Sequence, residues 1–413
     1  MFVCVIFVFW YFAGMHGYSI HDVYRLKEDL FKKSNYSSMI RPKINQRERT
    51  DIEIQMYLSR LLGLDTREQV LRTSGFFVIT WTDELLRWNP DEYGGIVEIT
   101  VQQKEIWFPD LHAANCIQGY EKFGSDDLRL YVNHSGTVDW EPSFSFSTSC
   151  VVNVSLFPLD IQKCSIEIVP WMTTNQEINI KDPKFDNSHF EAPNGDFAIT
   201  HTKVTQACYA VYSNPNYELT ESKFTFTLAR QSTFYFLNVV GPFVAISSLC
   251  VISFLIDSQS GEKLTVSITV LLSLTVYMSV IEDQIPKTAN NISYFVIYVA
   301  LMIGMSFLCV LCNVGTLYIH NRSPESPIPT WLGSIMARET AVEKSFPKSH
   351  HRHSVKSSTY RSISRCNCCD NPNVGCSCNH WPEIARMTDR VFLILITIAL
   401  VSINLGFLII HII

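Results

Sequence analysis

Hydroxyl, apolar and acidic residues recur at helical spacing between positions 262 and 283. Successive members lie three or four residues apart, so on an α-helix they share one face: Glu262, Thr265, Thr269, Leu272, Val276, Val280 and Asp283. Because a carboxylate near hydrocarbon costs about 3 kcal/mol on insertion scales, this face is unsuited to lipid. The alternative, a buried bundle helix with incidental threonines, does not explain the acids at both ends. The stripe therefore predicts a helix that lines a water-filled pore.

Acidic residues at the two ends of this helix would form charged rings if several copies surrounded one pore. Glu262 would form a ring at the cytoplasmic mouth, and Glu282 with Asp283 a double ring at the outer mouth. Rings of carboxylates favour cations and raise their local concentration. Lys263 does not cancel the inner ring, because adjacent residues point about 100 degrees apart on a helix. The stripe therefore predicts cation selectivity.

The middle of the stripe suits conduction and its control. Thr265 and Thr269 offer hydroxyl groups to partly hydrated ions in the inner half. Leu272 and Val276 form an apolar girdle, which can stop conduction by dewetting.

Four apolar segments reach the length of about 20 residues that a membrane-spanning helix needs. They are Phe234–Ile256, Leu264–Ile281, Tyr294–Tyr318 and Val391–Ile413. Pro242 removes a backbone donor within the first span and predicts a kink there.

The ends and the segments between the spans suggest an organisation. Residues 1–17 have a short apolar run followed by small residues, typical of a secretory signal peptide, with a fifth membrane helix as the alternative. We expect an extracellular domain over 18–230, three membrane helices within 231–319, a basic cytoplasmic loop over 320–385 and a fourth helix over 386–413. This organisation predicts a multi-pass protein of the plasma membrane with its N-terminal domain outside.

Short alternating runs separated by NP, GG, NHSG and PNGD turns fill residues 18–230, after one amphipathic helix around Ile20–Lys33. This pattern predicts a β-sandwich. Together with the four spans, the expected fold class is an extracellular β-sandwich and a four-helix transmembrane bundle, with a partly disordered cytoplasmic loop. The glycosylation sequons at Asn35, Asn133 and Asn153 fall in the predicted extracellular domain.

Composition and missing motifs exclude other function classes. A net charge of −6 and the lack of a basic stripe with interleaved aromatics argue against nucleic-acid binding. The sequence contains no HExxH, GxSxG or phosphate-binding glycine loop, so we expect no enzymatic activity, no cofactor and no metal site.

Two cysteines and their surroundings reveal a resemblance. Cys150 and Cys164 enclose 13 residues with a central FPLD turn, and GEK precedes the second span. Together with WTDELLRWNPDEYGGI and IWFPDL, these motifs resemble the Cys-loop family of pentameric ligand-gated channels, in particular an invertebrate nicotinic acetylcholine receptor-like subunit. The resemblance implies a Cys150–Cys164 disulfide and assembly with four other subunits, in a homo- or heteropentamer. It also implies a small cationic or amphiphilic extracellular ligand, conduction of monovalent cations and of Ca²⁺, and a postsynaptic location.

In this family the agonist binds between subunits in an aromatic cage, where cation–π attraction is worth about 2 kcal/mol when desolvated. Trp171 lies seven residues after the second loop cysteine, where the family places its central Trp. Phe76 replaces the Trp usual on the complementary face. Ala114 stands where a cage Tyr is usual, so that ring is lost.

The tip loop also departs from the pattern, because Cys208 stands alone where α-type subunits have two adjacent cysteines. The candidate cage residues there are Tyr209, Tyr212 and Tyr217, of which Tyr217 is favoured because it follows an Asn-Pro pair. For each ring the alternative is ordinary packing, and the resemblance outweighs it for Trp171 but not for Tyr209. Three functional alternatives follow: a ligand other than acetylcholine in a partial cage, an accessory subunit whose site another subunit completes, or acetylcholine gating.

The resemblance also implies how binding reaches the pore. The FPLD turn (Phe157, Pro158 and Asp160) would rest on the linker between the second and third spans, which contains Pro286, and Arg230 would sit among acids at that junction. Cys116 and Cys208 have no partner in the pattern and read either as free thiols or as a bonded pair. Five cysteines between 366 and 378 indicate lipidation, reduced thiols or, less well, Zn²⁺ binding.

Overall fold

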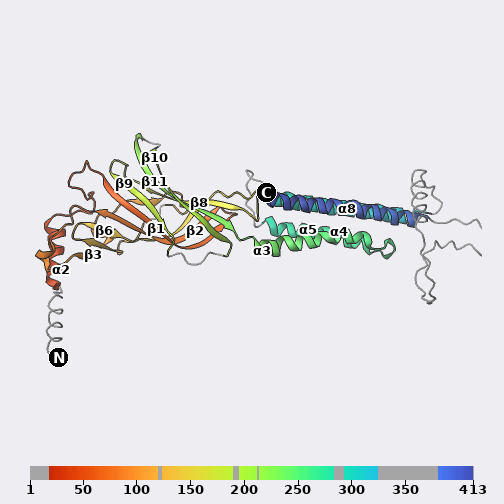
Figure 1. Ribbon diagram of the computed structural model, residues 1–413, viewed down its shortest axis with the longest axis horizontal. Helices are drawn as coiled ribbons and strands as arrows, with labels where there is room; N and C mark the ends of the chain where they lie inside the picture. Colours follow the sequence, from red (N-terminus) through yellow and green to blue (C-terminus); the bar gives the residue numbers. More distant parts are fainter. Residues whose placement is uncertain are drawn as a thin grey trace, which may run out of the picture. The chain divides into compact units, whose positions relative to one another are not determined.

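The computed structural model describes residues 18–119, 123–188, 195–211, 214–282, 293–323 and 380–412. These residues form two compact units, the first ending at Thr233 and the second beginning at Phe234 (Figure 1). The predicted signal peptide and cytoplasmic cysteines lie outside the described residues, as do Tyr212, Asp283 and Pro286.

The first unit opens with helix α2 (Ile20–Lys27), which continues as the π-helical turn η1 (Glu28–Lys33). Ser19 caps α2: its hydroxyl accepts from the Asp22 N–H, while the Asp22 carboxylate accepts from the Ser19 N–H at 3.1 Å. Leu26 and Leu30 are buried in the main core. This amphipathic segment therefore forms the helix that the sequence predicts.

Two sheets make up the rest of the first unit. The seven-stranded sheet has the order β3-β5-β6-β2-β1-β9, with β7 also paired to β2, and the four-stranded sheet the order β10-β11-β8-β4. The strands of the larger sheet are β1 (Thr50–Asp65), β2 (Val70–Thr82), β3 (Glu98–Gln102), β5 (Arg129–Asn133), β6 (Thr137–Trp140), β7 (Ser143–Ser149) and β9 (Ile178–Asp186). Those of the smaller sheet are β4 (Leu111–Ala113), β8 (Ile161–Pro170), β10 (Phe197–Val211) and β11 (Asn214–Arg230).

Alternating burial along the strands places one core between the two sheets. The buried residues include Phe77, Ile79 and Trp81 on β2, and Phe224, Phe226 and Leu228 on β11. The residues between them point outward, as a pleated strand requires. The predicted β-sandwich is confirmed.

Gly75 marks a close approach between β1 and β2. A Cβ atom there would lie 2.1 Å from the Tyr57 carbonyl oxygen, so no larger residue fits without backbone movement. The register between the strands shifts next to this point, between Leu58 and Arg60.

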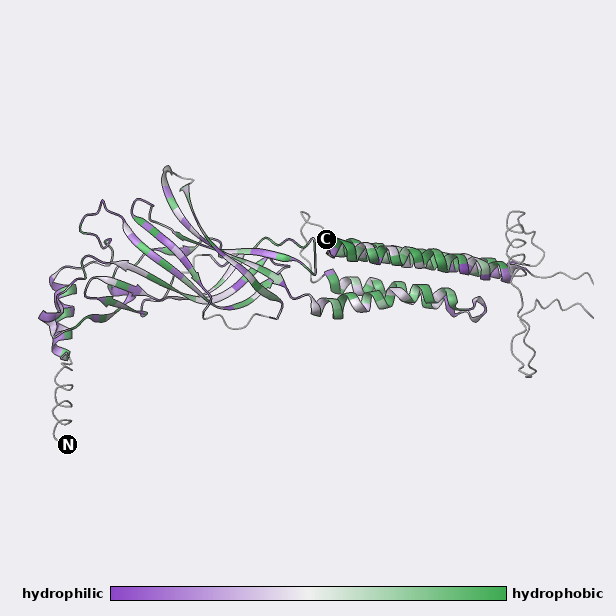
Figure 2. Ribbon diagram, in the orientation of Figure 1, coloured by the Kyte–Doolittle hydropathy of each residue, from purple (hydrophilic) through white to green (hydrophobic). Residues whose placement is uncertain are grey.

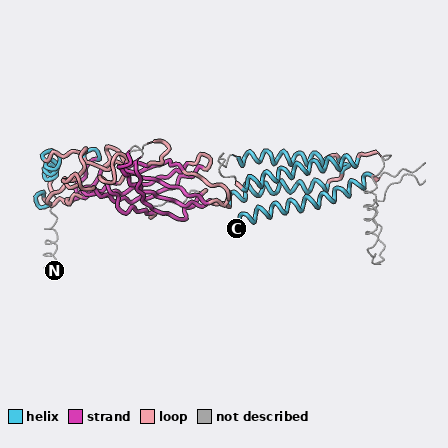
Figure 3. The backbone as a smooth tube through the Cα atoms, turned by 90° about the horizontal axis from the view of Figure 1, so that it is seen from above, coloured by secondary structure: helices cyan, strands magenta, loops and turns pink. Residues whose placement is uncertain are grey.

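The second unit contains four helices long and apolar enough to cross a membrane, counted over the described residues: Thr233–Leu255, Glu262–Glu282, Tyr294–His320 and Trp381–His411. The first combines α3 (Thr233–Tyr235), η4 (Phe236–Val240), α4 (Gly241–Ile252) and η5 (Ser253–Leu255), and the others are α5 (Glu262–Glu282), α6 (Tyr294–His320) and α8 (Trp381–Ile412). Figure 2 shows their largely hydrophobic colouring, and Figure 3 shows them running side by side.

Close to Pro242, where the sequence predicts a kink, the structure has a π-helical turn, η4, directly before α4. Because proline has no N–H, the carbonyl four residues earlier, that of Asn238, loses its helical donor. The Tyr277 hydroxyl of α5 donates to this oxygen at 2.7 Å and approaches the Val239 oxygen at 3.1 Å. A neighbouring helix thus satisfies the freed carbonyl.

Helix α8 begins at Trp381, five residues before the predicted fourth helix (386–413) and ten before the predicted apolar span at Val391. The side chains of Trp381, Ile384, Ala385 and Asp389 are buried along this added portion. Since these residues repeat at helical spacing but are mixed with charges, a hydropathy criterion alone does not detect the segment.

Candidate functional site

Trp171 follows β8 and is held by the neighbouring loop residue Asp110. The Trp171 N–H donates to the Asp110 carbonyl at 3.0 Å, and the Met172 N–H donates to the Asp110 carboxylate at 3.2 Å. His112 contacts the same carboxylate at 2.8 Å, and its ring and the indole are T-shaped, with centroids 6.5 Å apart. The indole remains 40% exposed, so a fixed aromatic surface faces outward.

Phe76 lies on β2, in the other sheet, and its ring is half-buried. It stacks on Tyr57 of β1, with ring centroids 4.8 Å apart and planes inclined by 6°. Trp171 and Phe76 therefore belong to different sheets, and Tyr57 is an aromatic neighbour that the sequence alone does not reveal.

Of the three tip-loop tyrosines, only Tyr209 has a described side chain. Tyr209 lies on β10 and is 41% exposed, whereas Tyr217 lies in β11 with no side chain described. Burial, with the negative charges of Glu221 and Glu167, raises the pKa of the Tyr209 hydroxyl. The hydroxyl therefore keeps its proton and can donate a hydrogen bond.

An acidic cluster lies beside Tyr209 on the outward face of the four-stranded sheet. Glu167 of β8 and Lys223 of β11 are directly paired in the ladder, with their charged atoms 2.5 Å apart. Burial and the charge of Glu167 raise the pKa of Glu221, although Lys223 opposes the shift. The cluster thus holds a carboxylate that would be stabilised by a further positive charge.

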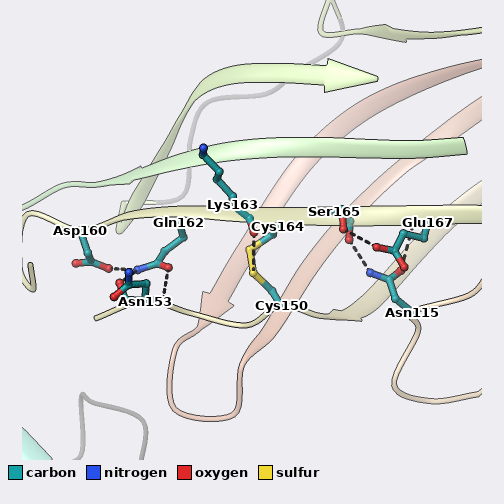
Figure 4. Close-up of a disulfide and its surroundings, with 9 residues drawn as sticks. All are labelled: Asn115, Cys150, Asn153, Asp160, Gln162, Lys163, Cys164, Ser165 and Glu167. Carbon is teal, nitrogen blue, oxygen red and sulfur yellow. Dashed lines mark hydrogen bonds between the residues drawn. A yellow bond between two sulfur atoms is a disulfide. The ribbon is translucent and has the colours of Figure 1, made fainter. Parts of the chain in front are cut away.

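The position of the missing cage ring adjoins this cluster. The Ala114 N–H donates to the Glu167 carbonyl at 2.7 Å. The side chain of the next residue, Asn115, donates to the Ser165 carbonyl and accepts from the Glu167 N–H (Figure 4). Where a tyrosine is usual, this surface therefore carries the methyl group of Ala114, in the turn directly after β4 and next to Glu167. In the sequence, the only sign of this polar surface is the alternation of polar and apolar residues in KCSIEIV and TESKFTF.

Cysteine chemistry in the first unit follows the expected pairing. Cys150 and Cys164 form the disulfide, with a sulfur–sulfur distance of 2.03 Å (Figure 4). Cys116 and Cys208 are free thiols, the first partly buried and the second exposed. Of the two alternatives for these residues, free thiols or a disulfide between them, the structure has the free thiols.

The FPLD turn contacts the arginine that ends β11. Arg230 donates from Nε and Nη2 to the two oxygens of Asp160, at 2.7 and 3.0 Å, and both side chains are almost fully buried. The guanidinium also lies over the rings of Phe157 and Phe197, at 5.1 and 4.5 Å from their centroids. The expected acidic neighbour of Arg230 is therefore a residue of the turn itself.

The predicted stripe lies along the side of α5 that the chain's other spans leave uncovered. Its described members are all exposed: Glu262, Thr265, Thr269, Leu272, Val276 and Val280, together with Glu282 at the end of the helix. The opposite side is buried: Lys263, Ser267, Val270, Leu274 and Ile281. The Thr269 hydroxyl donates to the Val266 carbonyl at 2.8 Å, which leaves its oxygen lone pairs available to a cation.

Comparison with known proteins gives the same two parts. A family model for the neurotransmitter-gated ion-channel ligand binding domain matches residues 23–232, and one for the neurotransmitter-gated ion-channel transmembrane region matches residues 239–374. The chain belongs to the neurotransmitter-gated ion channels. It is a member of a family of membrane-spanning channels rather than enzymes, and in that family the N-terminal ligand-binding domain is extracellular.

Similar proteins come from vertebrates and insects. The chain is 31% identical to the neuronal acetylcholine receptor subunit beta-3 of Rattus norvegicus over 78% of this chain and 68% of that protein. It is 29% identical to the acetylcholine receptor subunit alpha-L1 of Schistocerca gregaria over 77% of this chain, and spans 58% of that subunit's length. With the neuronal subunit alpha-5 of Rattus norvegicus it shares 28% identity over 89% of this chain and 84% of that protein. The nicotinic resemblance read from the motifs is confirmed.

Of the three sequons, Asn35 and Asn153 are exposed and Asn133 is half-buried in the strand end that precedes a turn. The Asn153 side-chain oxygen accepts from the backbone and hydroxyl of Ser155, the sequon's own serine. Glycosylation at these positions stays a prediction.

Proposed function

We propose that this chain is one of five subunits around a cation-selective pore that an extracellular ligand opens. The supporting observation is the uncovered face of α5. It begins with Glu262, continues with the hydroxyls of Thr265 and Thr269 and then with apolar residues, and ends at Glu282. In a ring of five subunits this face would surround the axis, and Glu262 would concentrate cations at the inner mouth. Monovalent cations, with Ca²⁺ among the divalent ones, would pass.

Cysteine accessibility tests which face of α5 meets water. Thr269→Cys should react with a membrane-impermeant thiol reagent and block current, whereas Ser267→Cys, on the buried face, should not. A reactive Ser267→Cys with an inert Thr269→Cys would refute the pore assignment. Glu262→Gln should reduce cation over anion permeability, and unchanged permeability ratios would refute the acidic ring.

We propose that the ligand is a cationic molecule and is not simply acetylcholine. It would bind between subunits in a partial cage. One side of the site would consist of Trp171, Tyr209, Tyr212 and Tyr217. The other side would be Phe76 of the next subunit. The support is the exposure of the first two rings, the stacked Phe76–Tyr57 pair, and the carboxylates beside Ala114. Trp171→Ala should abolish the response to the agonist, while Trp88→Ala in the core should instead reduce folded protein.

The second candidate is an accessory subunit whose site another subunit completes, favoured by the loss of the ring at Ala114. Expression of this chain alone separates the two. Spontaneous or ligand-evoked cation current from the homomer would dismiss the accessory role, whereas surface protein with no current under any agonist would support it. Acetylcholine is the first agonist to apply, and a current blocked by Trp171→Ala would establish the third alternative.

A further inference from the structure

Three polar side chains from different spans meet inside the second unit. Asn313 of α6 donates through Nδ2 to the Ser253 hydroxyl of η5 at 2.9 Å and to the Ser267 hydroxyl of α5 at 2.5 Å. All three residues are buried, and neither Asn313 nor Ser253 has any exposed surface. One amide thus joins the first, second and third spans. We call these three residues the asparagine clamp.

The hydroxyl protons decide how the amide of the clamp is turned. Ser253 donates to the Cys250 carbonyl at 2.7 Å, and Ser267 donates to the Lys263 carbonyl at 2.8 Å. Since each hydroxyl has only one proton, both oxygens act towards Asn313 as acceptors. The NH₂ group therefore faces the two serines and uses both of its protons there.

The carbonyl end of the same amide lacks a donor. Asn313 Oδ1 is buried and accepts no hydrogen bond from the part of the chain that the structure describes. A buried acceptor without a donor costs free energy, and an apolar side chain in its place would avoid that cost. The amide is therefore a poor means of stabilising the bundle. Its directional bonds are better suited to holding a helix in one orientation.

Ser267 is the residue through which the clamp bears on the uncovered face of α5. Thr265 and Thr269 lie two residues to either side of it, about 200 degrees around the helix. Both threonines are exposed, whereas Ser267 is buried. Lys263, one turn before Ser267 on the buried side, is bound to α8, so the clamp adds the first and third spans to what holds this side of α5. A contact fixed at Ser267 thus directs both threonines to the uncovered side.

We propose that Asn313 is a positioning residue for the pore, because its bond to Ser267 sets the rotation of α5 that turns Thr265 and Thr269 towards the axis. The inference rests on the proposed function, in which this face of α5 lines the pore. A rotation that carries Ser267 out of reach leaves an amide donor unpaired inside the bundle, which is costly. The clamp therefore disfavours rotated states of α5, and its loss makes them more frequent.

Thiol labelling in proteoliposomes tests this proposal and needs no current. Val270, on the buried side of α5, meets the pore water only when the helix rotates, so labelling of Val270→Cys by a membrane-impermeant maleimide reports the rotated state. The rate at this position is read from peptide masses of the full-length protein. Asn313→Leu should raise it about fivefold, the effect of losing one interhelical hydrogen bond. Ser267→Ala, which removes a single oxygen atom, should raise it at least as much, because it leaves an amide donor unpaired.

Two controls separate rotation of α5 from general loosening. Ser402→Ala on α8 removes a hydroxyl that also donates to the carbonyl four residues earlier at 2.8 Å, but at an exposed position outside the clamp, and should leave the Val270→Cys rate unchanged. Val299→Cys, fully buried on α6, should stay unlabelled with or without Asn313→Leu. Labelling that rises equally at Val299→Cys and Val270→Cys would show a purely structural role for Asn313 and overturn the proposal.

The two clamp substitutions together give the sharpest result. Because each removes the same bond, Asn313→Leu with Ser267→Ala should raise the Val270→Cys rate no more than Ser267→Ala alone, whereas an additive rise of about 25-fold would contradict the clamp. An unchanged rate with Asn313→Leu would also contradict it, and Ser267→Ala alone decides if the leucine variant does not fold. Failure of the pore assignment looks different: Thr269→Cys would then resist labelling while Asn313 is intact.

Discussion

Lys263 of α5 and Asp389 of α8 form an ion pair inside the second unit, with the lysine side chain completely buried and the carboxylate 10% exposed. The ammonium also lies 5.5 Å from the centroid of the Phe254 ring. A lysine turned inward fixes the rotation of the first turn of α5. Glu262, about 100 degrees away on the same helix, is thereby directed to the uncovered side.

Removing one partner of this pair should destabilise the protein. We expect Lys263→Met to cost about 3–5 kcal/mol, because it leaves the Asp389 carboxylate buried and unpaired. Thermal unfolding in detergent and the amount of assembled protein at the cell surface measure the loss. The double variant Lys263→Met with Asp389→Leu should recover much of it; a double variant no better than the single one would show that the ion pair is not the cause.

The hydrogen bond from Tyr277 to the carbonyl freed by Pro242 can be tested by removing one oxygen atom. Tyr277→Phe should lower the free energy of unfolding by about 1 kcal/mol, since the Asn238 carbonyl then lacks a donor within the helix bundle. Tyr318→Phe, at an exposed position on α6, is the matched control and should have no effect. Equal melting temperatures for all three proteins would contradict the role of Tyr277.

The Arg230–Asp160 pair should be one of the strongest single contributions in the first unit. Asp160→Asn should cost about 3–5 kcal/mol, because the buried guanidinium loses its counter-charge. Lys181→Ala, which breaks the exposed pair with Asp51, should cost less than about 1 kcal/mol. Chemical or thermal unfolding of the full-length protein compares the two, and similar losses would contradict the importance of burial.

Glu221 predicts a pH dependence of stability. Its pKa is raised above the ordinary 4.5 by burial and by Glu167, so the folded state holds the proton more tightly than the unfolded state. The contribution of the protonated group is therefore fully present below about pH 4.5 and is lost as the pH rises through the folded-state pKa.

Glu221→Gln removes this loss and should raise the melting temperature at neutral pH, with the difference from wild type shrinking toward pH 4.5. Melting curves of both proteins between pH 4 and 8 give the test. Glu218→Gln, at an exposed position of the same strand, is the comparison variant. A difference that grows on acidification would show that the folded-state pKa of Glu221 is lowered instead.

The sequence predicts those features that depend on local periodicity. The stripe on α5 follows from steps of three and four residues, and the sandwich from alternation along single strands, so neither needs knowledge of long-range contacts. The start of α8 at Trp381 is missed because charged residues such as Arg386 and Arg390 interrupt the apolar run there.

Contacts between distant segments could not be predicted in the same way. The pairing of Glu167 with Lys223 depends on the register between β8 and β11, and that of Lys263 with Asp389 on how α5 and α8 pack. In both cases one partner alone reads as an ordinary surface charge. The cage residues Trp171 and Phe76 were found through the motif resemblance, while Tyr57, which stacks on Phe76, lies on another strand with no motif to mark it.

The unbonded Cys208 gives the native protein a chemical handle one residue from Tyr209. Its exposed thiol sits across the hairpin from Thr220, where a small electrophilic dye could attach without engineering. Mild reductants have no bond to open at that position, so the tip of β10 should respond to alkylation but stay indifferent to dithiothreitol. Fluorescence from such a label would then follow movements of this hairpin whenever an agonist arrives.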